Sequence, residues 1–251
     1  AASAADAAVV LVDATKLDWQ NAGLKLLVQT RRHSLLVNLL RVPSIVFAVN
    51  KLDAVADSAL AFSNIRGALE AFAAEAGIAV TATVPALVPL ILEDTMFHKH
   101  LSGLSQEVGL TTVVKSRKVD CRTGSLLWTH FGISGPVVMD ASRFWTLGHE
   151  QGETVEVYGN FLPGQTQEQV KSWFIAQATD NPRRSLLKTL ARRLPEGFVE
   201  ALCSHVECDP QTAVAQLPRK DRDRLLAALT RFPFPIDRDR GWNYAEVTAG
   251  G

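Results

Sequence analysis

The chain has 251 residues, its 26 Lys and Arg residues are balanced by 26 Asp and Glu residues, and 47% of its residues are hydrophobic. This composition supplies enough apolar side chains for a packed core and argues against a disordered chain. Zero net charge argues against a general binder of nucleic acid or of anionic membranes, because proteins of both classes carry an excess of basic residues.

The N-terminus and the cysteines indicate where such a chain works. It begins at Ala1 without an initiator Met or a signal peptide, directly ahead of a predicted strand, so we expect it to start inside a longer protein. No apolar run reaches the roughly 20 residues that cross a bilayer. Three cysteines (Cys121, Cys203 and Cys208) are too few for a disulfide framework, which favours a reducing, cytoplasmic location.

Residues 1–83 alternate between strand and helix patterns. Continuous apolar runs predict buried parallel strands, and apolar residues at helical spacing predict the helices between them. The expected strands are Ala7–Asp13, Ser44–Val49 and Ile78–Val84, and the expected helices are Leu24–Leu40 and Ser58–Ala76. Such an arrangement is an incomplete parallel α/β unit with right-handed crossovers.

After Pro85 the pattern changes to short β-type runs separated by turn residues, which favours an antiparallel sheet or a small barrel. Residues 166–230 then look helical, with prolines between the segments, and residues 231–251 look like a loop. The expected strands are Ala86–Leu92, Leu110–Lys115, Lys118–Cys121, Ser125–Trp128 and Thr154–Tyr158. The expected helices are Pro136–Trp145, Gln167–Thr179, Arg184–Arg192, Gly197–His205 and Lys220–Thr230.

The first chemical signal is Asn50-Lys51-Leu52-Asp53, which follows a buried strand. The Asp53 carboxylate can accept two hydrogen bonds from the edge of guanine, Asn50 can bond the opposite edge, and the Lys51 stem can lie along the base. The alternative is an ordinary strand exit whose polar residues cap the next helix.

Three segments around this loop carry a family resemblance: Ala2–Asp13, Gln29–Leu35 and Ile45–Val55. They resemble the GTPase subunit of bacterial sulfate adenylyltransferase over residues 1–83. The resemblance implies part of a P-loop-GTPase-like α/β domain, with GTP and Mg in full-length relatives and an adenylyltransferase subunit as partner. It also implies that Asn50, Lys51 and Asp53 read guanine.

The phosphate-binding parts of that family are missing from this sequence. No GxxxxGK[ST] motif occurs in the chain, so no backbone cradle and Lys are available for the phosphates. The DxxG switch is also missing, and Pro85–Pro89 stands where the family closes a loop over the base. We therefore expect weak GTP binding and no hydrolysis.

The second chemical signal is the string Trp128–Pro136 (WTHFGISGP). Gly132 and Gly135 allow tight turns, Ser134 can cap the following helix, and His130 at the strand exit can donate to a substrate or shuttle a proton. His130 and Ser134 are therefore candidate catalytic residues. The alternative is a structural strand–turn–helix corner.

This string, with Pro85–Leu90, Leu101–Ser105 and Glu246–Gly251, resembles the BaiN-type (aminoacetone-oxidase-like) NAD(P)/FAD-dependent oxidoreductases over residues 84–251. The resemblance implies a β-rich, barrel-like inserted domain (84–160), a helical domain (161–232) and a tail (233–251) that leads towards a missing flavin-binding half.

In full-length relatives Thr248, Gly250 and Gly251 would approach the flavin. No GxGxxG turn follows a strand in this chain, so we expect neither FAD nor NAD(P) to be held tightly.

Smaller clusters predict little chemistry. Cys203, His205 and Cys208 lack a second ligand cluster, so no metal site is expected. The arginines at 183, 184, 192 and 193 form either an anion-binding face or, as zero net charge favours, a solvated helix face. The alternating charges of Asp237–Arg240 predict a salt-bridged surface.

Three functional hypotheses follow. The chain is part of a flavin-dependent oxidoreductase fused to a GTPase fragment and not catalytically competent alone, or a GTPase subunit for sulfate assimilation, or a non-enzymatic truncated fusion or assembly artefact. We expect no nucleic-acid or membrane partner. We also expect residues 1–83 to self-associate through an exposed sheet edge.

Overall fold

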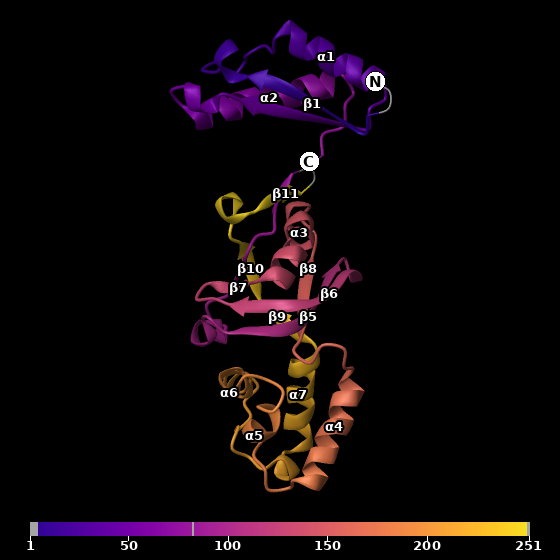
Figure 1. Cartoon of the computed structure of the whole chain (residues 1–251), viewed down its shortest axis with the longest axis vertical. Coiled ribbons are helices and arrows are strands. Elements are labelled where there is room, and N and C mark those ends of the chain that lie inside the picture. The colour runs from indigo at the N-terminus through magenta and orange to yellow at the C-terminus, as the bar shows by residue number, and fades with distance from the viewer. Residues whose placement is uncertain (1–4, 82, 250–251) are drawn as a thin grey trace. The chain divides into compact units, whose positions relative to one another are not determined.

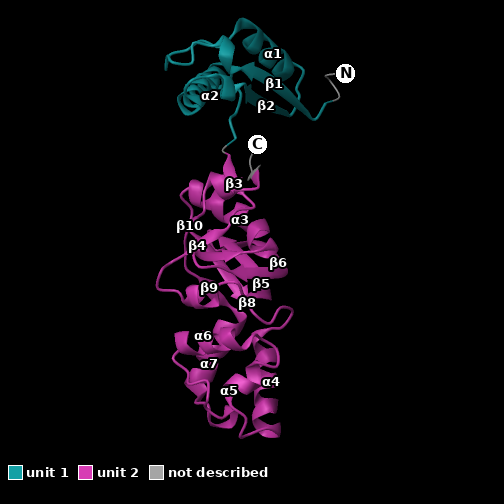
Figure 2. Ribbon diagram, turned by 60° about the vertical axis from the view of Figure 1, so that its left-hand side comes forward, with its two compact units in different colours: residues 1–82, 251 teal, residues 83–250 magenta. Residues whose placement is uncertain are grey.

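A computed structural model describes residues 5–81 and 83–249 of the chain. The contacts divide the chain into two compact units, one within residues 1–82 and one within residues 83–250 (Figure 2). Each unit has its own hydrophobic core. None of the described helices is long and apolar enough to cross a membrane.

The first unit contains a parallel pair of strands, β1 (Ala7–Asp13) and β2 (Ser44–Asn50). Two helices accompany them, α1 (Val28–Leu39) and α2 (Ser58–Glu75), which confirms four of the predicted elements. The 3-10 helices η2 (Ala14–Lys16) and η3 (Leu52–Ala54) follow the two strands directly. The buried side of β1 packs with apolar residues of α2, namely Ile65, Leu69 and Phe72.

The third strand predicted at Ile78–Val84 does not form. Residues 78–81 are irregular, and Val80 is 61% exposed. Val84 instead opens β3 (Val84–Ala86), which pairs antiparallel with β11 (Val247–Ala249) in the second unit. A strand needs a hydrogen-bonding partner along its length, and here the partner comes from the end of the chain. The parallel sheet of the first unit therefore has two described strands.

The second unit is built on seven strands in the order β10-β4-β7-β6-β5-β8-β9, with every neighbouring pair antiparallel. The strands are β4 (Leu90–Leu92), β5 (Ser105–Val114), β6 (Arg117–Trp128), β7 (Gly132–Ser134), β8 (Val155–Asn160), β9 (Phe232–Phe234) and β10 (Ile236–Asp239). The first and last strands in this order, β10 and β9, are separated along the chain by Pro235 alone. Since one residue joins these two end strands, the sheet curls into a barrel-like shape. The predicted antiparallel sheet is confirmed.

Two predictions for this unit are wrong in detail. The runs Lys118–Cys121 and Ser125–Trp128 are one continuous strand, β6, because β5 pairs along its whole length. The segment 231–251, expected to be a loop, contains β9, β10 and β11. In β9 both phenylalanines are buried around an exposed Pro233, an arrangement that an end strand of the hydrogen-bonded order tolerates.

Seven of the described helical segments in the chain are α-helices, and five of these lie in the second unit. They are α3 (Pro136–Glu150), α4 (Gln167–Asp180), α5 (Leu186–Leu190), α6 (Glu196–His205) and α7 (Arg219–Thr230). Short 3-10 helices are η4 (Phe97–Leu101), η5 (Val214–Gln216) and η6 (Trp242–Tyr244). Within this unit α4 to α7 gather at the end of the barrel away from β3 and β11 (Figure 1).

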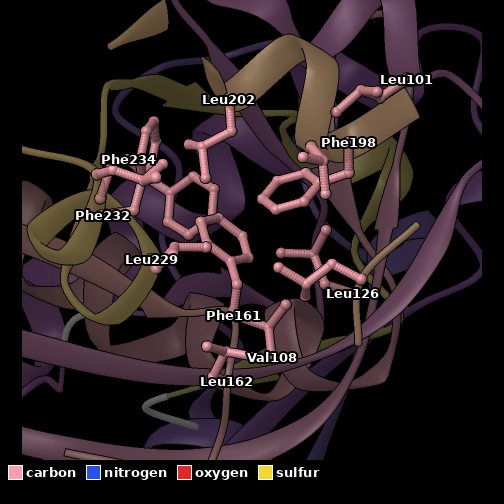
Figure 3. Packing of buried hydrophobic residues seen from close by; sticks show 14 of the residues in the cluster. Leu101, Val108, Leu126, Phe161, Leu162, Phe198, Leu202, Leu229, Phe232 and Phe234 are labelled. Carbon is pink, nitrogen blue, oxygen red and sulfur yellow. The ribbon is translucent and has the colours of Figure 1, made fainter. Parts of the chain in front are cut away.

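One aromatic core joins the barrel to these helices. Phe161 contacts Phe198 of α6 at a ring-centroid distance of 4.4 Å, and Trp128 of β6 lies 6.0 Å from the same ring. Figure 3 shows Leu202 of α6 and Leu229 of α7 in one cluster with Phe161 and with strand residues that include Val108 and Leu126. Burial of rings from strands and helices together makes the two parts stabilise each other.

Candidate functional site

The WTHFGISGP string forms a tight turn at the exit of β6. The Thr129 N–H donates to the Gly132 carbonyl (2.9 Å), and the Gly132 N–H donates to Thr129 Oγ1 (3.1 Å). His130 and Phe131 are thereby placed at the tip, and their rings are 5.1 Å apart, edge to face. His130 is exposed, so its imidazole is free to donate a hydrogen bond or to carry a proton. We call residues 129–132 the His130 turn.

The two glycines of the string are required by close backbone approach. A Cβ at Gly132 would lie 2.7 Å from the Leu92 nitrogen of β4, and a Cβ at Gly135 would lie 2.8 Å from the Ser125 oxygen of β6. Gly135 has a φ of 91° and occupies the N-cap of α3. The expectation that Ser134 caps this helix is wrong, because Ser134 ends β7 opposite Leu127 and no side chain caps α3.

An arginine that the sequence did not single out lies against the His130 turn. The Arg240 guanidinium carbon is 4.1 Å from the Phe131 ring centroid and 3.7 Å from that of Tyr244. The backbone N–H of Arg240 donates to the Pro89 carbonyl (3.0 Å). The predicted salt-bridged surface holds for Arg238, which pairs with Asp237 at 3.8 Å, whereas Arg240 makes no ion pair with a described residue.

This arrangement brings the exposed His130 imidazole and the half-buried Arg240 guanidinium beside two aromatic rings, those of Phe131 and Tyr244. Tyr244 is 49% exposed and the adjacent Trp242 is 54% exposed. Flat, cationic and aromatic groups together favour planar or anionic ligands. The sequence does contain a signal for this surface, since Trp242 and Tyr244 closely follow Arg240. These residues lie in the segment that the sequence predicts to be a loop.

A second histidine lies buried near this turn. His98 of η4 is fully buried, and neither ring nitrogen has a hydrogen-bond partner among the described residues. Burial is the main cause that lowers the pKa of His98 below its ordinary value, with the Lys99 charge acting in the same direction. Burial therefore disfavours the charged form of His98 in the folded protein.

The Asn50-Lys51-Leu52-Asp53 loop lies at the carboxyl ends of β1 and β2. Asp13 and Asn50 end the two strands opposite each other, and Lys51 adopts a left-handed conformation (φ 59°). Asn50 Oδ1 accepts from the Lys51 N–H (2.8 Å). The Asp53 carboxylate is exposed, and no described group donates to it. The loop thus brings the three predicted guanine-reading residues to one edge.

Lys51 makes a contact that spacing did not predict. Its Nζ lies 2.7 Å from Asp13 Oδ2, and Thr15 Oγ1 donates to the other Asp13 oxygen (2.6 Å). The hydrogen bond from Lys51 is the main cause that lowers the pKa of Asp13 to about 2. Asp13 therefore stays ionised in ordinary buffers and holds Lys51 towards the strand end.

The tail residues assigned to the flavin side are only partly described. Thr248 lies in β11 opposite Pro85 of β3, so this part of the segment expected to be a loop is a paired strand. Gly250 and Gly251 lie outside the described residues.

The two thiols of the cysteine cluster, Cys203 and Cys208, are buried. Cys203 is fully buried, and burial raises its pKa to about 12, so the thiolate is disfavoured. No group of three His, Cys, Asp or Glu residues in the described ranges could hold a metal ion.

Comparison with known proteins divides the chain into the same two units as its contacts do. Residues 84–247 match the family described as HI0933-like protein barrel and H2TH domain. The ribosomal RNA dihydrouridine synthase of Escherichia coli K12 is 31% identical over 175 residues, which cover 70% of this chain and 41% of that protein. The 3-dehydro-bile acid delta(4,6)-reductase of Clostridium scindens is 25% identical over 181 residues, covering 72% and 44%.

The remaining similarity is to a different protein. Sulfate adenylyltransferase subunit 1 of Sulfurovum sp. NBC37-1 is 44% identical over 84 residues, which cover 34% of this chain and 16% of that subunit. The chain thus spans less than half the length of each of these relatives. The family match covers well over half of the chain and agrees with the observed barrel and helix pairs, so the protein belongs to the HI0933-like barrel and H2TH domain family.

Proposed function

We propose that residues 84–247 are the substrate-binding part of a flavin-dependent reductase whose substrate is a base in RNA. The observation that carries this proposal is the 31% identity, across 70% of the chain, to a ribosomal RNA dihydrouridine synthase. A second such synthase, from Haemophilus influenzae, is 30% identical over 177 residues. The BaiN-type resemblance supports the same reaction class, a reduction that uses a nicotinamide and a flavin.

The His130 turn supports contact with a planar substrate. A base can stack on the exposed rings of Trp242 or Tyr244. His130 and the guanidinium of Arg240 then supply hydrogen-bond donors for carbonyl oxygens of the base. We assign His130 as a proton or hydrogen-bond donor to the substrate, and Ser134 remains a weaker candidate because it is partly buried at the end of β7.

The described residues do not fit the pyrophosphate of FAD. Dinucleotide folds use glycine to leave room for phosphate beside a helix start. At Gly132 and Gly135 that room is filled by the backbone of β4 and β6. We propose that residues 84–247 contact the substrate but do not catalyse the reduction by themselves.

Equilibrium binding to the full chain tests the substrate class. The probes are a fluorescent, uridine-rich single-stranded RNA and a fluorescent 3-oxo bile acid. We expect RNA binding in the micromolar range and no saturable binding of the steroid. His130→Ala and Arg240→Ala should each weaken RNA binding, whereas Arg66→Ala in the first unit should not. Saturable binding of the steroid without RNA binding would replace the RNA assignment with a small-molecule one.

A second function is proposed for residues 5–81, that of reading guanine. The exposed Asp53 carboxylate beside Asn50 and Lys51 supports it, as does the identity to sulfate adenylyltransferase subunit 1. The loop offers hydrogen-bonding groups for the base of GTP, but the chain has no GxxxxGK[ST] motif to hold its phosphates. An adenylyltransferase subunit is the partner that this ancestry proposes.

Calorimetric titration distinguishes base reading from an inert loop. We expect guanosine and GTP to bind with similar, weak affinity, because the phosphates gain no contacts. Asp53→Asn should abolish binding, and Asp57→Asn, a matched change at the N-cap of α2, should leave it unchanged. Equal binding of adenosine would refute guanine recognition.

A further inference from the structure

We propose that a single-stranded RNA segment lies in a groove on the outer face of strands β5, β6 and β8, next to the C-terminal end of α7. This inference rests on the proposed function and adds a binding surface that is separate from the His130 turn. The groove is a cavity of about 500 Å³ in the described structure. Its lining residues are Thr111, Val113, Ser116, Lys118, Glu156, Tyr158, Gly159, Asn160, Thr230 and Arg231. We call it the Arg231 groove.

The strand register explains why these side chains point outward together. Val113 of β5 pairs with Lys118 of β6 on one side and with Glu156 of β8 on the other. Thr111 pairs with Tyr158 in the next row on the same face. Side chains alternate between the two faces of a strand, so the buried residues between these, such as Thr112 and Val157, point to the interior. The outer face therefore combines polar side chains with Val113 and one aromatic ring, that of Tyr158.

Arg231 gives this face a platform for a base. Its guanidinium carbon lies 4.3 Å from the centroid of Tyr158, and Arg231 is exposed. A guanidinium that is stacked on an aromatic ring is held flat, and RNA bases stack on such planes. The Tyr158 hydroxyl donates to Glu156 Oε1 (2.8 Å), which fixes the ring from its other end.

The groove also carries free positive charge. Neither Lys118 nor Arg231 makes an ion pair with a described residue, and Glu156 is the acidic residue in the lining. Two cations can neutralise two phosphates, and the Glu156 carboxylate can accept from a ribose 2′-hydroxyl. Zero net charge of the whole chain does not oppose such a local site.

A neighbouring cavity extends the path. Arg231 also lines a cavity of about 370 Å³ with His205, Arg224 and Phe232. Arg224 is already paired with Glu207 and Asp221, so Arg231 is the cation that both cavities share. The path thus runs from the outer face of the barrel to the α6–α7 helix pair. A strand of several nucleotides fits this geometry better than a compact small molecule.

Fluorescence anisotropy with a uridine-rich single-stranded RNA tests the groove on the full chain. We expect the Lys118→Ala/Arg231→Ala double variant to bind on the order of tenfold more weakly, with the salt dependence reduced by about 1.4 in log–log slope. The matched control, Arg219→Ala/Lys220→Ala, removes two charges at the opposite end of α7 and should bind within about twofold of wild type. Arg231→Lys should keep the salt slope but lose affinity, because it removes the flat guanidinium.

The outcomes separate this inference from the function on which it rests. If wild type binds RNA and both double variants lose affinity equally, or neither does, the groove is not the binding surface although RNA remains the substrate. If wild type binds no RNA, the proposed function fails and the groove with it. Equal affinity for single-stranded and double-stranded RNA would contradict the stacking role of Arg231. Circular dichroism of each variant checks that the exposed substitutions leave the fold intact.

Discussion

The two units of this chain differ in how their β-sheets end, because the outer strands of a sheet present unpaired N–H and C=O groups. In the second unit, Pro235 joins the first and last strands of the hydrogen-bonded order, so the sheet closes on itself. In the first unit, β1 and β2 pair only with each other among the described strands, and each keeps a free edge. The first unit also contributes eleven of the seventeen exposed large apolar side chains, although it is about a third of the described chain.

This difference shows that two conditions must be met for a stable sheet. The sequence must favour each strand locally, and other elements must cover both faces of the sheet. Apolar runs were sufficient to form β1 and β2, but a two-stranded sheet is marginal unless both faces are covered. Leu11 and Val9 are 68% and 64% exposed on one face of β1, while Val10 and Val12 are buried on the other. The barrel, in contrast, buries residues from strands and helices in one cluster.

The largest expected effect comes from breaking the core of the second unit. Phe198→Ala removes a fully buried ring that contacts Phe161 and Trp128, and should lower the free energy of unfolding by about 3–5 kcal/mol. The control is Phe62→Ala on α2, where the ring is 46% exposed. Urea titration followed by near-ultraviolet circular dichroism measures both. Equal losses for the two variants would mean that the barrel core is not better packed than the first unit.

A glycine pair gives the next effect, with opposite signs in the two units. Gly132→Ala forces a Cβ onto the backbone of β4 and should destabilise the second unit by about 1–3 kcal/mol. Gly67→Ala lies inside α2 with nothing within 4 Å of the new Cβ, and should stabilise the first unit by up to about 1 kcal/mol. Thermal unfolding of both variants is the measurement, and a stable Gly132→Ala protein would disprove the close approach.

Self-association through the first unit is a smaller effect and remains a prediction. Leu11→Lys places a charge on the exposed face of β1 and should weaken self-association at least about tenfold, which corresponds to about 1.4 kcal/mol. Val119→Lys, at an exposed apolar position of β6, is the matched control. Sedimentation velocity across a concentration series measures both. A wild-type chain that stays monomeric at high concentration would remove the basis for the expectation.

The smallest expected effect is a pH dependence that belongs to the second unit. Because burial lowers the pKa of His98 in the folded state, the unfolded state binds more protons below the ordinary value of 6.5. Stability is therefore complete above pH 6.5 and falls as the pH drops through this value towards the lowered pKa. His98→Phe should flatten that part of the stability curve. His100→Phe, at a neighbouring exposed position, should not change it.

An element could be predicted from the sequence when nearby residues determine it. It could not be predicted when it depends on a partner strand from a distant part of the chain. The strand β1, the helix α2 and the Asn50–Asp53 loop follow from apolar runs and spacing, and each forms as expected. Ile78–Val84 has the same apolar pattern, but no described strand pairs with residues 78–81, which are irregular. The local sequence does not reveal whether a partner strand will lie beside these residues.

The candidate sites divide in the same way. His130 was identifiable because the glycines around it mark a turn, whereas Arg240 and Arg231 were not. Arg240 reaches Phe131 from a distant part of the sequence, and Arg231 meets Tyr158 only because the chain returns after four helices to complete the barrel. The sequence predicts a loop at this point because Pro233 and Pro235 lie close together, and neighbouring prolines indicate a loop more often than an end strand.

Hydrogen exchange of the full chain, read by mass spectrometry, tests the contrast between a closed and an open sheet most directly. The closed barrel predicts that amides of β5, β6 and β8 exchange only through global unfolding of the second unit, and that amides of β1 and β2 exchange orders of magnitude faster. Protection of β1 and β2 equal to that of β5 in the monomer would contradict the account.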